Sequence, residues 1–289
     1  MKISGTTLVY GIIGNPIEHT LSPLLHNYYF SEIGYNAVYV PFKLDFEFSK
    51  KNCFKNTIKS LSIQGLSITI PYKKLGYLIS DQRDSLTELT LSCNTIRIKN
   101  QFYGYNTDGI GAIKAILTKS NIDNKNILIL GYGGAASAIS GAILIHHKPK
   151  GIFITGRDKN KGKQLVKLLN KKIQHQSKIK FIEKEHKEFV PENFDIIINT
   201  TPLGMKGYPY KEFPLPENFI LKNHIIMDII YNPIETPLLQ FAKRKKATVI
   251  EGYWMFLFQA IEQMKIFTDN YPDHRIIEKL KKLLLKNLK

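Results

Sequence analysis

Apolar runs, turn residues and amphipathic stretches follow one another along most of the chain. This alternation is typical of βαβ units that build a mostly parallel sheet. It predicts strands over residues 7–13, 37–41, 65–70, 127–130, 152–155, 195–199 and 225–228, and a β-hairpin formed by 93–98 and 101–104. We therefore predict an α/β protein, and 289 residues are enough for two domains.

Helix signals lie between these predicted strands. Ser22 is predicted to be an N-cap with Pro23 at the first helical position, and Gly34 is predicted to end the same helix. Further helices are expected to open at 108–109 and 236–237. The others are a lysine-rich helix over 159–171, a strongly apolar one over 254–267 and a C-terminal one over 279–289, whose leucines are expected to face a core rather than a membrane or nucleic acid.

Residues 127–145 contain no charged side chain, and an uncharged run of this length could cross a membrane. Gly131, Gly133 and Gly134 argue against a span, because clustered glycines are typical of a sharp turn from a strand into a helix. Ala136 stands where a third glycine often stands. Such a turn presents bare backbone amides to a pyrophosphate at the positive end of a helix dipole. We therefore predict a dinucleotide site, with a plain tight turn as the alternative.

The end of the next predicted strand bears on the choice of dinucleotide. Gly156 and Arg157 come first, and a guanidinium at this place can pair with the 2′-phosphate of NADP. Lys161, four residues further on, adds a second cation. Asp158 could instead accept hydrogen bonds from the ribose hydroxyls of NAD, or cap the helix that follows.

Hydroxyl side chains alternate in two short segments of the first half of the chain. Thr20 and Ser22 point the same way if their segment is extended, and so do Ser67 and Thr69. Such pairs suit an anionic or polyhydroxylated ligand, although Ser22 could merely cap its helix and Thr20 could be solvated. Lys73 lies beyond the end of the second segment, where a lysine is ordinarily a solvated surface charge.

Composition limits the classes of protein and of partner. Hydrophobic residues make up 43% of the chain and charged residues 22%, which excludes a disordered protein. The net charge of +17 is large enough to attract nucleic acid, an anionic membrane or an acidic small molecule. Cys53 and Cys93 form neither a CxxC pair nor a disulfide framework, and no secretory signal is predicted, so we expect a cytoplasmic protein.

Spaced motifs give the chain a resemblance to one family, the shikimate dehydrogenases. They are 14–27 (GNPIEHTLSPLLHN), 67–73 (SITIPYK), 94–95 (NT), 104–109 (GYNTDG), the glycine turn from 131, 199–205 (NTTPLGM), 228–233 (DIIYNP) and 252–259 (GYWMFLFQ). The resemblance covers nearly the whole chain in the family's order. Any one of these motifs is weak evidence, whereas the set is highly specific.

The resemblance implies a two-domain enzyme with a Rossmann-like nucleotide-binding domain, a smaller α/β substrate domain and a cleft between them. The substrate domain is expected to be discontinuous, over 1–107 and 252–289, and the NADP-binding domain is expected over 108–251. The implied reaction is the reversible reduction of 3-dehydroshikimate to shikimate with NADPH, which belongs to aromatic amino-acid biosynthesis. Whether the enzyme is a monomer or a homodimer is left open.

The resemblance also implies roles for single residues. Lys73 and Asp108 take the family's catalytic places. The substrate-binding places are taken by Thr20, Ser22, Thr69, Asn94, Tyr231 and Gln259, and the cofactor-binding places by Gly131, Tyr132, Gly133, Gly134, Ala135, Gly156, Arg157, Lys161, Ile229 and Gly252. A hydride delivered to a carbonyl carbon leaves an alkoxide, and a lysine supplies both the nearby cation and the proton that it needs. Asp108 could alternatively cap the helix that begins near Gly109.

Several positions depart from the family's pattern. Ser67 stands where the family usually has asparagine, although serine occurs among its members that accept quinate. Thr20 replaces a more usual serine, and Ser92-Cys93 replaces a small Ala-Val pair. Gly156 begins a segment that differs from the usual Asn-Arg-Thr. A quinate/shikimate dehydrogenase that uses NAD or NADP is therefore the alternative function.

Two other classes of function compete with an enzyme. A catalytically silent ligand sensor on the same fold would be expected to lack Lys73 or Asp108, and both are present. A nucleic-acid-binding protein would account for the net positive charge, but the sequence contains no recognisable nucleic-acid-binding motif. Neither nucleic acid nor a membrane is therefore expected as a partner. No metal site is expected, because the adjacent His146 and His147 cannot share one helix face.

Overall fold

The computed structural model describes residues 3–45, 51–172, 177–208 and 215–288, and the chain divides into two compact units. Unit 1 comprises Met1–Thr107 and Gln259–Asn287, and unit 2 comprises Asp108–Phe258 and Leu288–Lys289. The sequence places the second division at 251/252. In the structure it falls after Phe258, inside helix α9 (Gly252–Thr268), which begins at Gly252 and continues from unit 2 into unit 1.

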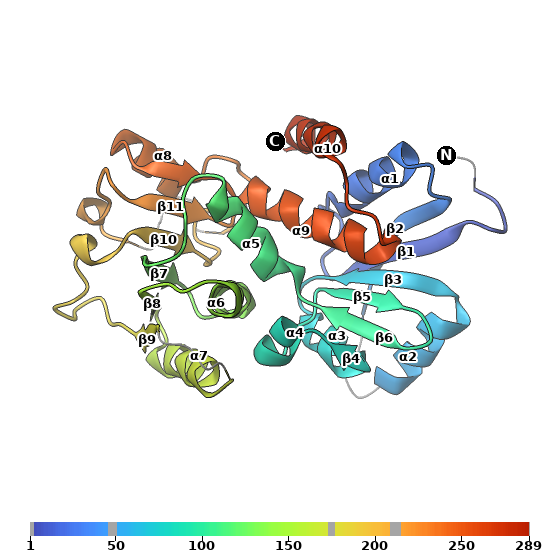
Figure 1. The fold of residues 1–289 in the computed structure, drawn as a ribbon, viewed down its shortest axis with the longest axis horizontal. Coiled ribbons are helices and arrows are strands. Elements are labelled where there is room, and N and C mark those ends of the chain that lie inside the picture. The colour runs from blue at the N-terminus through green and yellow to red at the C-terminus, as the bar shows by residue number, and fades with distance from the viewer. Residues whose placement is uncertain (1–2, 46–50, 173–176, 209–214, 289) are drawn as a thin grey trace. The chain divides into compact units, whose positions relative to one another are not determined.

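The described residues of unit 1 form a six-stranded sheet in the order β2-β1-β3-β5-β6-β4 (Figure 1). Its first three strands are parallel, and β5 is antiparallel to both β3 and β6. The predicted hairpin is thereby confirmed as β5 and β6, with Ile96 opposite Gly104. The strands are β1 (Leu8–Gly14), β2 (Ala37–Lys43), β3 (Ile63–Ile68), β4 (Gln82–Arg83), β5 (Thr95–Ile98) and β6 (Phe102–Tyr105).

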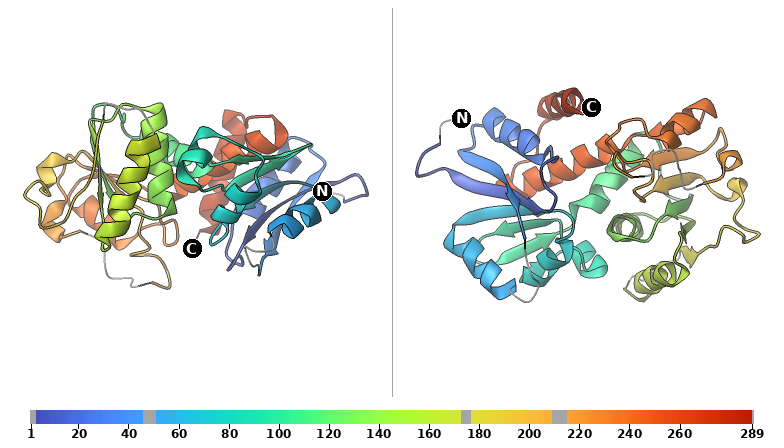
Figure 2. Two further views of the ribbon diagram at one scale, coloured as in Figure 1. Left: turned by 90° about the horizontal axis from the view of Figure 1, so that it is seen from below. Right: turned by 180° about the vertical axis from the view of Figure 1, so that it is seen from behind.

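Helices cover both faces of this sheet (Figures 1 and 2). On one face Tyr10 of β1 packs against Phe30 of α1, at 5.4 Å between ring centroids, and against Phe267 of α9, at 5.0 Å. On the other face, Ile58 of α2 and Leu75 of α3 belong to one core cluster with strand residues. The helices that lie within unit 1 are α1 (Ser22–Glu32), α2 (Lys51–Ser60), α3 (Lys73–Ile79), α4 (Ser85–Thr90) and α10 (His274–Asn287).

Helix α1 begins at Ser22 itself, so the prediction that Ser22 is the N-cap is wrong. The N-cap residue is Leu21, which provides no side-chain cap. The Ser22 hydroxyl is buried and accepts a hydrogen bond from Thr20 Oγ1 at 3.2 Å. Its partner is therefore the preceding loop rather than the amides of the first helical turn.

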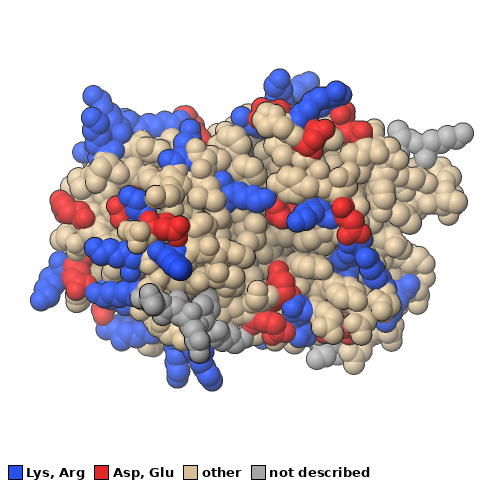
Figure 3. Space-filling view, viewed as in Figure 1, with Lys and Arg blue, Asp and Glu red and all other residues tan. Residues whose placement is uncertain are grey.

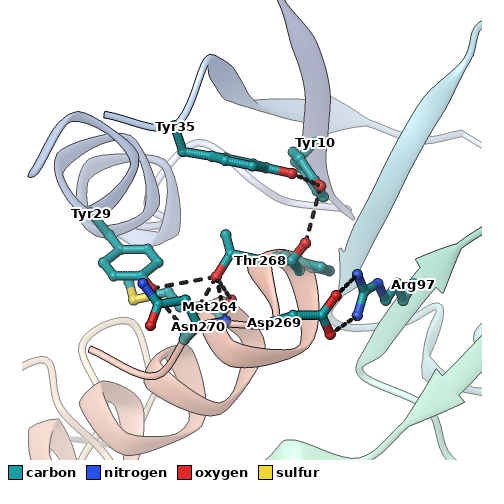
Figure 4. A network of polar contacts seen from close by, with 9 residues as sticks. Tyr10, Tyr29, Tyr35, Arg97, Met264, Thr268, Asp269 and Asn270 are labelled. Atoms are coloured by element: carbon teal, nitrogen blue, oxygen red, sulfur yellow. Dashed lines mark hydrogen bonds and ion pairs between the residues drawn. The ribbon is translucent and has the colours of Figure 1, made fainter. Parts of the chain in front are cut away.

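The C-terminal end of α9 is held to the sheet and to helix α1 of unit 1 by the polar contacts drawn in Figure 4. Arg97 of β5 pairs with both carboxylate oxygens of Asp269. Tyr10 Oη donates to the carbonyl of Phe267 at 3.2 Å, and Tyr29 Oη donates to that of Asn270 at 2.8 Å. These contacts fix the position of the helix that carries Gln259.

The described residues of unit 2 form a second six-stranded sheet, in the order β12-β11-β10-β7-β8-β9, whose paired strands are all parallel. The strand order reverses between β7 and β10, and ligands of such sheets bind outside the carboxyl ends of the strands at this point. The strands are β7 (Asn126–Leu130), β8 (Gly151–Thr155), β9 (Lys178–Phe181), β10 (Ile196–Asn199), β11 (Ile225–Asp228) and β12 (Thr248–Ile250).

The uncharged run over 127–145 is divided between β7 and α6 (Gly134–His146), which confirms the predicted turn from strand to helix. Residues Ile127 to Leu130 are all buried, because the parallel sheet is covered on both faces. None of the helices in the described ranges is sufficiently long and apolar for a membrane span. The other helices of this region are α5 (Thr107–Leu117), α7 (Lys159–Lys172) and α8 (Pro237–Arg244).

Charged side chains are scattered over the face drawn in Figure 3, with acidic groups lying among the basic ones. Several lysines have acidic partners, such as Lys279 with Glu32 at 2.6 Å and Lys55 with Asp81 at 2.5 Å. On this face the basic side chains thus lie in small groups rather than in one basic stripe.

Candidate functional site

In unit 1 the loops that follow β1 and β3 meet at one edge of the sheet. The amide of Thr69 donates to the carbonyl of Ile13 at 3.0 Å. Gly14 makes this approach possible, because a Cβ at that position would lie 2.4 Å from Thr69 Cγ2. The loop that carries Thr20 and Ser22 is therefore next to the segment that carries Thr69.

Lys73 and Asn94 lie at the same edge. Lys73 is the first residue of α3 and is half-buried, and its carbonyl accepts from the amide of Cys93 at 3.0 Å. The carbonyl of the next residue, Asn94, accepts from the amide of Ile68 at 2.7 Å. The five residues predicted from the first half of the chain thus lie on neighbouring segments of unit 1.

A buried polar network that the sequence analysis did not identify lies beside these residues. Gln263 Oε1 accepts from Ser67 Oγ at 2.8 Å and lies 3.3 Å from His26 Nε2, while Gln263 Nε2 donates to Thr95 Oγ1 at 3.0 Å. The His26 ring stacks on Tyr39 at 4.2 Å between centroids, and burial lowers the pKa of His26 to about 3. The one available sequence signal was that Gln263 follows the predicted substrate residue Gln259 by one helical turn.

In unit 2 the glycine turn presents exposed backbone at the start of α6. Gly131 has a φ of +114°, and a Cβ there would lie 2.5 Å from Thr200 Oγ1. Gly133 is the N-cap of α6 and offers no side chain to the first amides. A Cβ on Gly133 or Gly134 would meet no heavy atom within 4 Å, so the space in front of this helix end is open. Exposed amides at a helix N-terminus form an anion site.

The loop after β8 lies against this turn, since the amide of Gly131 donates to the carbonyl of Thr155 at 2.8 Å. Asp158 Oδ1 accepts from the amide of Lys161 at 3.0 Å, so Asp158 caps α7. The Lys161 ammonium also lies near Asp158, at 3.8 Å. Arg157 is exposed and makes no hydrogen bond or ion pair with any residue in the described ranges. Its guanidinium is therefore available to an anionic ligand at this edge.

The ring of Tyr132 covers Gly156. A Cβ at Gly156 would lie 2.6 Å from Tyr132 Cε1, so the ring occupies the volume that a side chain at 156 would need. The two predicted cofactor segments are therefore in direct contact within unit 2.

Ile229 and Gly252 also lie together in unit 2. A Cβ at Gly252 would lie 2.6 Å from the carbonyl oxygen of Ile229 and 2.4 Å from that of Ile230, so only glycine fits at the start of α9. Tyr231 packs its ring on Phe256, at 4.7 Å between centroids, and burial raises the pKa of its hydroxyl.

Asp228 sits at the end of β11 with no exposed surface. Its carboxylate accepts from Thr236 Oγ1 at 2.7 Å, from the amide of Ile230 at 3.1 Å and from Asn199 Nδ2 at 3.1 Å. Burial raises the pKa of Asp228 to about 6, and these hydrogen bonds oppose part of the rise. The sequence motif 228–233 begins at Asp228, but its hydrogen bonds to Asn199 and Thr236 become visible only in the fold.

Asp108 lies in the first turn of α5, which begins at Thr107, so it does not hold the N-cap position. The predicted residues fall into two groups. Unit 1 holds Thr20, Ser22, Thr69, Lys73, Asn94 and Gln259, and unit 2 holds Asp108, Tyr231 and the cofactor-binding set. Over the described parts of the chain, no group of three or more His, Cys, Asp or Glu side chains is arranged to hold a metal ion.

Comparison with known proteins gives a consistent result. Residues 12–96 match the family described as the shikimate dehydrogenase substrate binding domain. The chain is 39% identical over 289 residues to a shikimate dehydrogenase (NADP(+)) of Methanosphaera stadtmanae, with 99% of each protein covered. It is 35% identical to the enzyme of the same name from Pyrococcus furiosus, with 96% of each covered.

Solved structures agree with these relatives. A shikimate dehydrogenase in complex with NADP+ superimposes with a TM-score of 0.88 at 33% identity, covering 100% of this chain and 98% of the other. A shikimate 5-dehydrogenase from Listeria monocytogenes in complex with shikimate and NAD gives a TM-score of 0.89 at 27% identity, covering 98% of both chains. From its motifs, its fold and these matches, the chain belongs to the shikimate dehydrogenase family.

Proposed function

We propose that the protein catalyses the reversible reduction of 3-dehydroshikimate to shikimate with NADPH. The observation that carries the proposal is the group in unit 1 in which the segment of Thr69 and Lys73 lies next to the segment of Asn94 and to the loop after β1 that leads to Thr20 and Ser22. Its hydroxyls and amide suit a polyhydroxylated acid, and its lysine suits a carbonyl that becomes an alcohol. Full-length relatives named shikimate dehydrogenase (NADP(+)) support the same function.

Lys73 is assigned the proton transfer. Its ammonium group stabilises the developing alkoxide and gives the proton to the substrate oxygen, and in the reverse direction the neutral amine accepts the proton from the alcohol. Asp108 is assigned the second catalytic place, on the strength of the family resemblance. NADPH, when bound, supplies the hydride.

Substrate binding is assigned to hydroxyl and amide groups. Ser22 accepts from Thr20, so its own hydroxyl proton is directed elsewhere and can be donated to an anionic group such as a carboxylate. Thr69, Asn94, Tyr231 and Gln259 complete the substrate-binding set.

The residues of unit 2 fit a dinucleotide that carries a 2′-phosphate. The open N-terminus of α6 suits the pyrophosphate, and the contact between Gly252 and the Ile229 backbone brings two further predicted cofactor-binding residues together. Because Asp158 is used to cap α7, Arg157 is the group that meets the ribose, and it favours NADP over NAD.

A coupled pair of assays tests the proposal. NADPH consumption is followed by absorbance with 3-dehydroshikimate, and NADP+ reduction is followed with shikimate and with quinate. We expect turnover in both directions and a clear preference for shikimate. No turnover with dehydroshikimate or shikimate would contradict the proposal.

The second candidate is a quinate/shikimate dehydrogenase that accepts NAD as well as NADP. It is favoured by Ser67, which replaces the family's usual asparagine in the substrate-facing segment. Equal efficiency with quinate and shikimate, together with equal use of the two cofactors, would establish it in place of the first. A cytoplasmic location is proposed for either enzyme, because Cys53 and Cys93 are both free thiols.

A further inference from the structure

The hydrogen bonds of the buried network in unit 1 have directions that can be worked out from one fixed donor. The backbone amide of Thr107 can only donate, and it lies 2.8 Å from Asn94 Oδ1. Because an N–H needs an acceptor, this contact establishes which end of the Asn94 side-chain amide is the oxygen and which is the nitrogen. An amide oxygen carries no hydrogen, so Thr95 Oγ1, at 2.9 Å from the same oxygen, must give its proton to Asn94.

Thr95 Oγ1 is then left as an acceptor. Its other partner is the side-chain amide of Gln263, at 3.0 Å, so the nitrogen of Gln263 must face Thr95. The carbonyl of Asn94, 3.5 Å from the same nitrogen, requires the same orientation. The oxygen of Gln263 therefore points the other way.

Two side chains face the Gln263 oxygen and must both donate to it. Ser67 Oγ lies at 2.8 Å, so its proton is committed to Gln263, and only lone pairs remain on the Ser67 oxygen. His26 Nε2 lies at 3.3 Å, so it carries the hydrogen of the neutral ring. His26 Nδ1, buried and without a hydrogen-bond partner among the described residues, is then the bare nitrogen.

We propose that Gln263 is a positioning residue for substrate recognition, which orients Ser67 so that its hydroxyl can only accept a hydrogen bond from an alcohol group of the substrate. The inference rests on the proposed function for the identity of that substrate. Ser67 lies two residues before Thr69 and is 2% exposed, so a donor that approaches it is shielded from water.

Through Thr95, the same glutamine holds Asn94 in place. Gln263 follows Gln259 by one turn of α9, and α9 is tied to the sheet by the contacts drawn in Figure 4. One face of this helix thus carries Gln259, a predicted substrate-binding residue. One turn further on it carries Gln263, which positions Ser67 and Asn94.

The kinetic test is Gln263→Met, which keeps the length of the side chain and removes both hydrogen-bonding ends. We expect the KM for shikimate to rise about tenfold, as for the loss of one buried hydrogen bond, with kcat within about threefold and the KM for NADP+ unchanged. The matched control is Gln240→Met, since Gln240 is exposed on α8 and its amide makes one bond, to the carbonyl of Glu235.

Two further variants identify the route of the effect. In a Ser67→Ala background, Gln263→Met should raise the KM for shikimate less than it does in the wild type, because its partner is already absent. Gln263→Glu retains an acceptor for Ser67 but has no donor for Thr95, and it should also raise this KM. Wild-type kinetics in Gln263→Met together with a lower melting temperature would overturn the proposal and leave Gln263 with a structural role only.

A measurement on the wild-type protein tests the bond directions without activity. Nitrogen NMR of the His26 ring should show hydrogen on Nε2 and a bare Nδ1. The opposite tautomer would reverse the Gln263 amide and overturn the assignment of Ser67 as an acceptor. If the wild type does not turn over shikimate, the proposed function fails, and the tautomer still decides the direction of the network.

Discussion

At the scale of single residues, Lys73 and Lys74 are adjacent and differ in their surroundings. Lys73 is half-buried beside Thr69 and the segment that carries Asn94, whereas Lys74 is exposed. In a chain with 41 Lys and Arg, residue type alone says little about function, and the neighbours of each lysine separate a catalytic role from a solvated one.

We expect Lys73→Ala to lower kcat for shikimate oxidation by about 10²–10⁴-fold, because proton transfer and charge stabilisation are needed mainly in the transition state. Binding of shikimate, followed by calorimetry, should change much less. Lys74→Ala is the matched control and should behave like the wild type. Turnover of Lys73→Ala within a few-fold of the wild type would remove Lys73 from the mechanism.

Asp228 gives a second prediction at this scale, for stability against pH. Its pKa in the folded protein is raised from 3.8 to about 6, so between these values the folded state holds a proton that the unfolded state has lost. The contribution of this group to stability therefore falls as pH rises through that window, by about 3 kcal/mol in all.

Asp228→Asn isolates this contribution, because asparagine has no proton to lose. The difference in unfolding free energy between the wild type and the variant, from urea titrations at pH 4 and pH 7, should shift in favour of the variant at the higher pH. Carboxylates with lowered pKa values, such as Asp269 beside Arg97, make the protein more stable as pH rises. They are present in both the wild type and the variant, so their contributions cancel in the difference between the two unfolding free energies. A difference that does not change with pH would contradict the prediction.

At the scale of elements, the strand–turn–helix of β7 and α6 and the loop between β8 and α7 were both predicted, whereas α2, α3 and α4 were not. The missed helices of unit 1 have 10, 7 and 6 residues. Elements this short contain at most about three turns, so their apolar periodicity is weak and packing decides their form.

The loop after β8 carries the prediction for the cofactor. We expect NADP to be preferred over NAD by about tenfold or more in kcat/KM, equal to about 1.4 kcal/mol, with the preference falling as salt concentration rises. Arg157→Ala should lower kcat/KM for NADP by about the same factor and leave NAD nearly unchanged.

Lys163→Ala, an exposed lysine of α7, is the control for the general effect of positive charge. If the wild type uses both cofactors with equal efficiency, the assignment of Arg157 is wrong and the second candidate function is favoured.

At the scale of the whole molecule, unit 1 is built from both ends of the chain. The C-terminal helix α10 packs on α1, where Lys279 pairs with Glu32 at 2.6 Å, and Leu280 and Leu284 are fully buried. The prediction that the leucines of the C-terminal helix face a core is confirmed for these two residues.

Leu284→Ala should therefore lower the free energy of unfolding by about 2–5 kcal/mol, as for other large-to-small changes in a core. Hydrogen exchange followed by mass spectrometry should show faster exchange in β1 and β3 of unit 1 and little change in β7 and β10 of unit 2. Lys282→Ala, on the exposed side of α10, serves as control. An equal loss of protection in both units would contradict this localisation.

The α/β class, most strands of both sheets, the glycine turn and the family could all be predicted from the amino-acid sequence. These features depend on local patterns, such as apolar runs, turn residues and motifs of a few neighbouring residues, which are visible in one dimension. The residues expected to bind substrate in unit 1 were named in the same way, from their motifs.

The groups that lie together inside each unit could be identified only from the folded structure. Ser67 and Gln263 are separated by 196 positions along the chain, and Arg97 and Asp269 by 172. The direction of a buried hydrogen bond depends on every partner of its donor and acceptor, so it follows from the folded network and not from any local pattern. For the same reason Ser22, predicted to cap its helix, proved to bind the hydroxyl of Thr20 instead.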